Sequence, residues 1–124
     1  MAKTFTDLQK RIMARAISMP VSQSLYLQKG HIASAKGLQY RGFLDQHCYT
    51  VVQTHHVTPE GRSAFFAEHG DVFAIDDIYD NCWLVFEDRH VIARPRSKEA
   101  ADRLVKALKA LRDLERQDAN KIAA

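Results

Sequence analysis

The sequence predicts an α+β fold for a chain of 124 residues. Apolar residues recur at helical spacing near both ends of the chain, and the middle holds short runs of β-branched and aromatic residues that favour strands. The length suits one compact domain, or one domain with a small appendage, because typical domains hold about 100 to 150 residues. No run approaches the roughly 20 consecutive apolar residues of a membrane span, so we expect no membrane partner.

The first third of the chain predicts three helices. One helix over about 7–18 begins at the cap residue Thr6, and its apolar residues return every three or four positions. A shorter helical run over 23–29 ends at Gly30, a residue typical of helix C-termini. A third helix over about 32–41 completes the group.

Strands and a further helix follow. The segment 48–54 is rich in β-branched and aromatic residues and predicts a strand, for which 44–46 supplies the partner strand or the lead-in. Thr58-Pro59 is typical of a helix start, because proline lacks the N–H that the first helical turn leaves unpaired. The helix that it predicts covers residues 60–69.

The remainder of the chain predicts a strand over 72–78, a hairpin of strands 82–86 and 90–93, and a long helix from the cap Ser97 to about Gln117. The strand 82–86 is apolar on both of its faces, which is typical of a strand covered on both sides. The long helix covers one face of this strand. The other face is covered either by the first half of the chain or by a second copy of the protein.

We expect residues 1–70 to form one unit and residues 71–117 a second unit that packs with it as one domain, followed by a frayed tail over 118–124. The leucines of the long helix repeat at the spacing of a helix-packing seam, which also fits an ordinary core stripe within one chain. A homodimer through the C-terminal helix is therefore one of two open interpretations.

Charge is distributed unevenly, although the net charge is only +3. Residues 1–67 hold eight basic and three acidic residues, whereas residues 68–90 hold seven acidic residues against Arg89 alone. This asymmetry predicts different partners for different faces, with the basic first half suited to a phosphate backbone. A surface of mixed charge without a polyanionic partner is the alternative.

The order of features over residues 31–69 carries a resemblance. A helix ends in Tyr-Arg-Gly-Phe-Leu at 40–44, a strand-like run follows at 49–52, and Thr-Pro-Glu-Gly-Arg at 58–62 opens the next helix. This order resembles the second half of the winged-helix domain in small bacterial and phage regulators of the MarR and PadR types. The chain departs from that pattern by Gly37 in the helix and by histidines in place of a basic wing tip.

The resemblance implies a winged-helix-like first half, followed by a small antiparallel sheet and a long C-terminal helix. It implies a non-enzymatic regulator that binds double-stranded DNA, with residues 32–41 as the recognition helix. The residues it assigns to phosphates and base edges are Lys29, Ser34, Lys36, Gln39, Tyr40, Arg41 and Arg62. Solvated helix surface is the alternative for each of these side chains.

A second function remains open. The acidic segment could dock on a basic surface of a host protein, as in a phage or plasmid encoded factor that inhibits a nucleic-acid-handling machine. The residues proposed for that contact are Asp76, Asp77, Asp80, Glu87 and Asp88.

No catalytic, metal or cofactor site is predicted. The six histidines and two cysteines lack the paired short spacings typical of zinc sites, and the cluster Asp76, Asp77 and Asp80 lacks the glycine and downstream glutamate of a calcium loop. No phosphate-binding glycine loop or nucleophile elbow occurs. The N-terminus lacks a secretory signal, so we expect a cytoplasmic protein in which Cys48 and Cys82 are thiols.

Overall fold

A computed structural model describes residues 5–19, 25–49 and 52–123 of the chain. It confirms the α+β class, with small antiparallel sheets and a long C-terminal helix. The helical elements are α1 (Asp7–Ser18), the 3₁₀ turn η1 (Lys29–His31), α2 (Ile32–Tyr40), α3 (Pro59–His69) and α4 (Lys98–Ala123). The strands are β1 (Leu25–Tyr26), β2 (Leu44–Tyr49), β3 (Val52–Val57), β4 (Val72–Asp76), β5 (Trp83–Glu87) and β6 (His90–Ala93).

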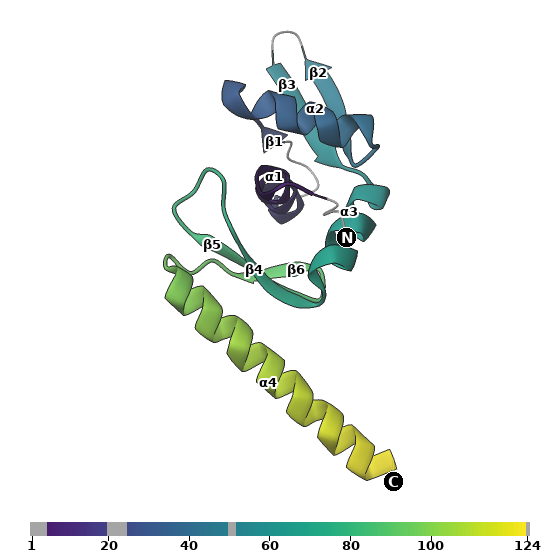
Figure 1. Cartoon of the computed structure of the whole chain (residues 1–124), viewed down its shortest axis with the longest axis vertical. Helices are drawn as coiled ribbons and strands as arrows, with labels where there is room; N and C mark the ends of the chain where they lie inside the picture. The colour runs from purple at the N-terminus through teal and green to yellow at the C-terminus, as the bar shows by residue number, and fades with distance from the viewer. Residues whose placement is uncertain (1–4, 20–24, 50–51, 124) are drawn as a thin grey trace.

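The strands form two antiparallel sheets of three strands each, in the orders β1-β3-β2 and β4-β5-β6. Figure 1 shows α1 between the two sheets, with α2 against the first sheet and α4 running along the outer face of the second. Helix α3 leads from the first sheet to the second. The molecule is therefore layered, and α1 is the central helix of its core.

Local capping explains why α1, α3 and α4 begin where the sequence predicts. Thr6 and Gln9 form a reciprocal capping box at the start of α1, and the Thr58 side chain accepts a hydrogen bond from the Gly61 N–H in α3. At α4, the Ser97 hydroxyl oxygen accepts from the Ala100 N–H at 3.1 Å. These interactions are local in sequence, so the pattern of residue types was sufficient to predict them.

The helix predicted over 23–29 is wrong. Leu25 and Tyr26 form β1, which pairs with β3 through Leu25 opposite His55, and Gly30 lies within η1 rather than at a helix C-terminus. Residues 20–24 lie outside the described residues. Backbone pairing with a strand some thirty positions further along the chain outweighs the weak helical preference of this segment.

The single strand predicted over 48–54 is also wrong. The chain reverses within it, so that β2 and β3 pair from Leu44 opposite Val57 to Tyr49 opposite Val52. Residues 50–51 lie outside the described residues. Strand propensity is equally high on both arms of this hairpin and gives no information on where the chain turns.

The second sheet agrees more closely with the prediction. β4 ends at Asp76, before the predicted end at residue 78, because the Asp77 carboxylate accepts the N–H groups of Tyr79 and Asp80 and so begins a turn. The hairpin of β5 and β6 is confirmed. Its turn consists of two residues with positive φ, Asp88 at 50° and Arg89 at 72°, as the twist of paired strands favours.

Helix α4 continues to Ala123, so the frayed tail predicted over 118–124 is not seen in its described part. The sequence contains no glycine or proline after Pro95 that would end the helix. The long helix therefore meets no helix-breaking residue over its observed length.

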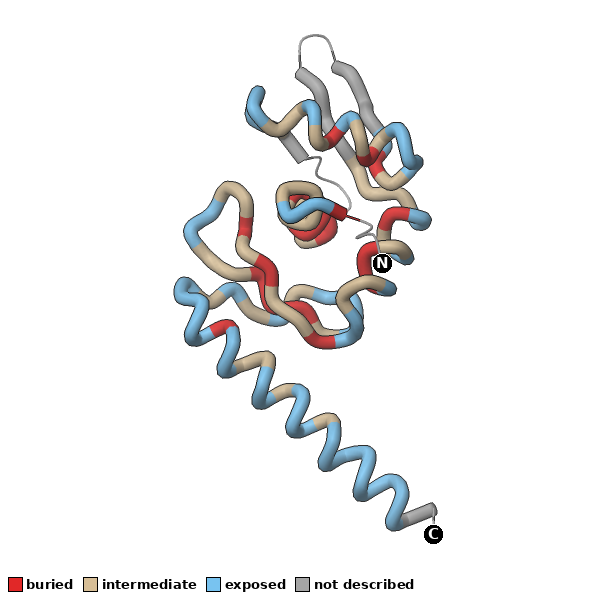
Figure 2. Tube along the Cα trace, viewed as in Figure 1, coloured by how far each residue is buried: buried red, intermediate tan, exposed pale blue. Residues whose placement is uncertain are grey.

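The two predicted units share one hydrophobic core. A single cluster of buried residues includes Ile12 of α1, Leu38 of α2 and Phe86 of β5, and the aromatic ring of Phe65 lies within it. Figure 2 shows buried segments on α1, α2, α3 and the second sheet. The prediction that β5 is covered on both faces is confirmed. The first half of the chain covers the face of Phe86, and α4 packs on the other face, where Val85 is fully buried.

Protonation of His69 provides a pH test of this core. Burial lowers the pKa of His69, Lys10 lowers it further, and Glu68 partly opposes them. The pKa of His69 in the folded protein lies below its ordinary value of 6.5. The contribution of neutral His69 to folding stability is therefore complete above pH 6.5 and is lost as the pH falls below it. We expect the melting temperature to fall on acidification, and to fall less in His69→Phe, which retains the ring contact with Phe73. Equal pH dependence of both proteins in thermal circular dichroism would contradict this role.

Candidate functional site

Helix α2 presents a polar outer surface. Lys36 and Tyr40 lie one turn apart on its outward side, and Tyr40 is 94% exposed, whereas Ala35 and Leu38 are fully buried. Gln39 and Ser34 are half-buried at the edges of this surface. A large aromatic side chain exposed to this extent contributes almost nothing to the core, so its position is available for a ligand.

Arg41 has a structural role in addition to its position at the end of α2. Its guanidinium lies 5.3 Å from the ring centre of Phe5 and 5.0 Å from that of Phe43, and it donates to the Gln9 side chain at 3.1 Å. Such cation–π contacts contribute about 0.5 to 1 kcal/mol each at exposed sites. Arg41 therefore ties α2 to α1, which makes it a poor position for testing binding by mutation.

The structure brings together most of the residues that the resemblance assigned to DNA. Lys29 lies in η1 directly before α2, so it joins Ser34, Lys36, Gln39, Tyr40 and Arg41 around one helix. We call Lys29, Lys36 and Tyr40 the α2 surface. Arg62 lies elsewhere, because α3 carries it toward the end of α1.

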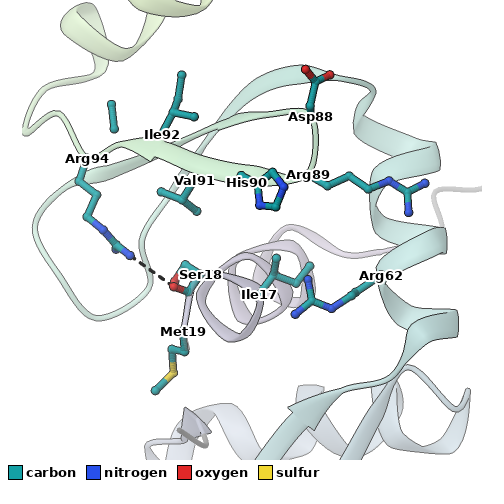
Figure 3. Close-up of a pocket in the computed structure, with 11 residues that line it drawn as sticks. Ile17, Ser18, Met19, Arg62, Asp88, Arg89, His90, Val91, Ile92 and Arg94 are labelled. Atoms are coloured by element: carbon teal, nitrogen blue, oxygen red, sulfur yellow. Dashed lines mark hydrogen bonds between the residues drawn. The ribbon is translucent and has the colours of Figure 1, made fainter. Parts of the chain in front are cut away.

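Arg62 lines a cleft of about 960 Å³ between the end of α1 and strand β6 (Figure 3). We call it the arginine cleft. Its lining residues are Ile17, Ser18, Met19, Arg62, Asp88, Arg89, His90, Val91, Ile92, Ala93 and Arg94. Val91 points from β6 toward the end of α1, and Ile92 points away (Figure 3).

Cations outnumber anions in the arginine cleft. Arg89 lies 5.4 Å from the ring centre of Phe66, and Arg94 donates to the Ser18 carbonyl at 3.5 Å. The only carboxylate among the lining residues, that of Asp88, is occupied by Arg112 at 3.0 Å. The cleft is therefore electrostatically suited to an anionic group. Of its lining residues, only Arg62 could be identified as a candidate from the sequence, since the walls of the cleft come from three separate segments of the chain.

Three of the acids proposed for a protein contact are paired within the chain. Arg15 lies 3.0 Å from the Asp77 carboxylate and 2.7 Å from that of Asp80, and Arg11 lies 3.6 Å from Asp76. Asp77 is only 2% exposed. The hydrogen bond and positive charge of Arg15 lower the pKa of Asp80. This part of the acidic segment therefore fastens the β4–β5 connection to α1.

The remaining two acids pair with α4. The Arg112 guanidinium lies 3.0 Å from Asp88, 3.8 Å from Glu87 and 3.6 Å from Asp71. These ion pairs hold the middle of α4 to the edge of the second sheet. Both parts of the acidic segment thus form ion pairs with arginines of the same chain, although Arg112 alone faces three carboxylates.

The described residues offer little support for a metal site or a nucleophilic cysteine. Among them, no group of three or more His, Cys, Asp or Glu side chains is placed to hold a metal ion. Burial raises the pKa of the Cys82 thiol, and the nearby Asp77 and Asp80 carboxylates raise it further, which opposes formation of a nucleophilic thiolate. The side chain of Cys48 lies outside the described ones.

Comparisons with protein families, with characterised proteins and with solved structures found no match. In the described part of the chain, none of the helices has the length and apolar character needed to cross a membrane.

Proposed function

We propose that the protein binds double-stranded DNA through the α2 surface. The observation that carries this proposal is the pair Lys36 and Tyr40, which project from the outward side of α2 and do not pack in the core. Among the described residues, Lys29 and Lys36 form no ion pair with an acid, so their charges are available to phosphates. An exposed tyrosine beside them adds a hydroxyl donor and a flat ring.

The topology supports the same proposal. Helix α2 is followed directly by the β2–β3 hairpin, β1 completes the sheet in the order β1-β3-β2, and the capped helix α3 comes next. This order is similar to the winged-helix arrangement that residues 31–69 resemble, in which the helix enters the major groove and the hairpin lies beside it.

One feature of the chain limits the kind of binding. Residues 19–31 separate α1 from α2, whereas the two helices of a helix-turn-helix are joined by a turn of about 3 to 4 residues. We therefore propose that contacts to the phosphate backbone supply most of the affinity, and that sequence preference is modest. Such binding suits an architectural or weakly selective regulatory protein.

The internal ion pairs disfavour a protein contact through the acidic segment. A partner that engaged Asp77 would have to remove it from Arg15 and from burial, which is costly for a desolvated charge. Binding through Lys29, Lys36 and Tyr40 of the α2 surface does not require such an ion pair to be broken.

A charge-reversal experiment tests the proposal. We expect the double variant Lys29→Glu/Lys36→Glu to lose at least about tenfold in affinity for a short mixed-sequence duplex, because two phosphate contacts become repulsive. The measurement is fluorescence anisotropy of a labelled duplex at low salt. The matched control Lys106→Glu/Lys109→Glu makes the same charge change on exposed positions of α4 and should bind almost as the wild type does.

Equal loss in both double variants would mean that only net charge matters, and the α2 surface would be the wrong site. Arg41 is left unchanged in this design, since its contacts with Phe5 and Phe43 would confuse a binding effect with a stability effect.

A further inference from the structure

The second half of α4 projects away from the rest of the molecule. Figures 1 and 2 show this part of the helix beyond the second sheet, and every described residue from 113 to 121 is exposed. Two large apolar side chains lie on it in water, with Leu111 51% exposed and Leu114 58% exposed. Most of the stability of a protein helix comes from packing of an apolar face, and the described residues from 113 to 121 have no such packing within their own chain.

Helix α4 carries two separate apolar faces. One face, with Ala101 and Leu108, lies toward the second sheet and continues into Arg112 with its ion pairs. The other is rotated by about a quarter turn and has the alternating four- and three-residue spacing of a coiled-coil seam. The residues of this second face, which we call the α4 seam, are Ala100, Leu104, Ala107, Leu111 and Leu114.

We propose that the α4 seam packs against the α4 seam of a second copy of the chain, with the two helices antiparallel. In this arrangement Leu104 meets the partner's Leu114, and Leu111 meets the partner's Ala107. The two central layers of the contact then pair a leucine with an alanine, which allows the helices to approach closely there, and the two outer layers pair leucines. The pairing is two-fold symmetric, so each contact occurs twice in a closed dimer.

Charge selects the antiparallel orientation. The seam line continues beyond Leu114 to Asp118 and Lys121, so parallel helices would place Asp118 against the partner's Asp118 and Lys121 against the partner's Lys121. Antiparallel helices instead place Asp118 within reach of the partner's Arg103, which flanks the seam. Both residues are exposed in the single chain, so they are free to form this pair.

The oligomeric state tests the proposal, independently of nucleic-acid binding. We expect the wild-type protein to sediment as a dimer at micromolar to millimolar concentration, and Leu111→Glu/Leu114→Glu to sediment as a folded monomer that loses at most the helical signal of the second half of α4. The control Lys106→Glu changes an exposed residue on the opposite side of α4 and should remain a dimer. A monomeric or higher-order wild-type protein over that whole range would overturn the proposal.

A charge swap tests the orientation. Arg103→Glu should raise the dimer dissociation constant at least about fivefold, since two ion pairs per dimer become repulsive. Adding Asp118→Arg to the same chain should restore most of the affinity by reversing the pair. If the double variant is as weak as Arg103→Glu or weaker, the antiparallel arrangement is wrong.

Discussion

Replacing Asp77 by alanine is expected to lower the free energy of unfolding by about 3 kcal/mol, because it removes the buried carboxylate that pairs with Arg15 and leaves two backbone N–H groups without their acceptor. The Asp77 side chain is fully buried and lies 3.0 Å from Arg15 and 4.0 Å from Arg94. It also accepts two backbone N–H groups that shape the turn after β4. Urea denaturation followed by circular dichroism measures the change.

Asp76 supplies the control for this prediction. Its carboxylate is about half exposed and lies 3.6 Å from Arg11, so Asp76→Ala should cost no more than about 1 kcal/mol. Similar costs for the two variants would contradict the structural role of the buried pair. A loss of stability in Asp77→Ala would also explain any loss of binding in that variant without assigning Asp77 to a partner surface.

Phe65→Ala is expected to cost about 4 kcal/mol, as truncation of a fully buried aromatic side chain typically does. Phe65 lies between the two halves of the molecule. Its ring centre is 6.1 Å from that of Phe5 in the segment before α1, and 6.0 Å from that of Phe86 in β5. The variant should therefore weaken both halves together and retain a single cooperative transition in urea denaturation.

Tyr40→Ala is the matched aromatic control, since Tyr40 is 94% exposed and its removal should change the free energy of unfolding by less than about 0.5 kcal/mol. Two separate transitions in Phe65→Ala, with only one of them shifted, would show that the halves fold independently and would contradict the shared core.

The parts of the fold that the sequence predicts well are those specified locally. Helix α1 follows from the Thr6 cap and its apolar spacing, α3 from Thr58-Pro59, and the β5–β6 hairpin from two apolar runs around a polar turn. β1 could not be predicted in this way, because its two residues become a strand only through pairing with β3. The same limit explains the missed reversal between β2 and β3.

The same distinction between local and long-range contacts applies to the candidate sites. Exposure of Lys36 and Tyr40 follows from helical periodicity, so the α2 surface could be predicted from one segment of the chain. The arginine cleft and the burial of Asp77 depend on contacts across more than sixty residues, such as Arg15 with Asp77. The sequence shows a run of acids that could serve as a docking surface, and only the fold shows that several of them pair with α1 and α4.

The most direct test of the central claim is the binding of the wild-type protein to mixed-sequence duplex DNA across a series of salt concentrations. Neutralisation of phosphates makes the logarithm of the affinity fall linearly with the logarithm of salt, with a slope of about −0.9 per phosphate contact. We expect a clear negative slope that becomes shallower by about 2 in Lys29→Glu/Lys36→Glu. Absence of binding at low salt, or a slope that the double variant leaves unchanged, would contradict DNA binding through the α2 surface.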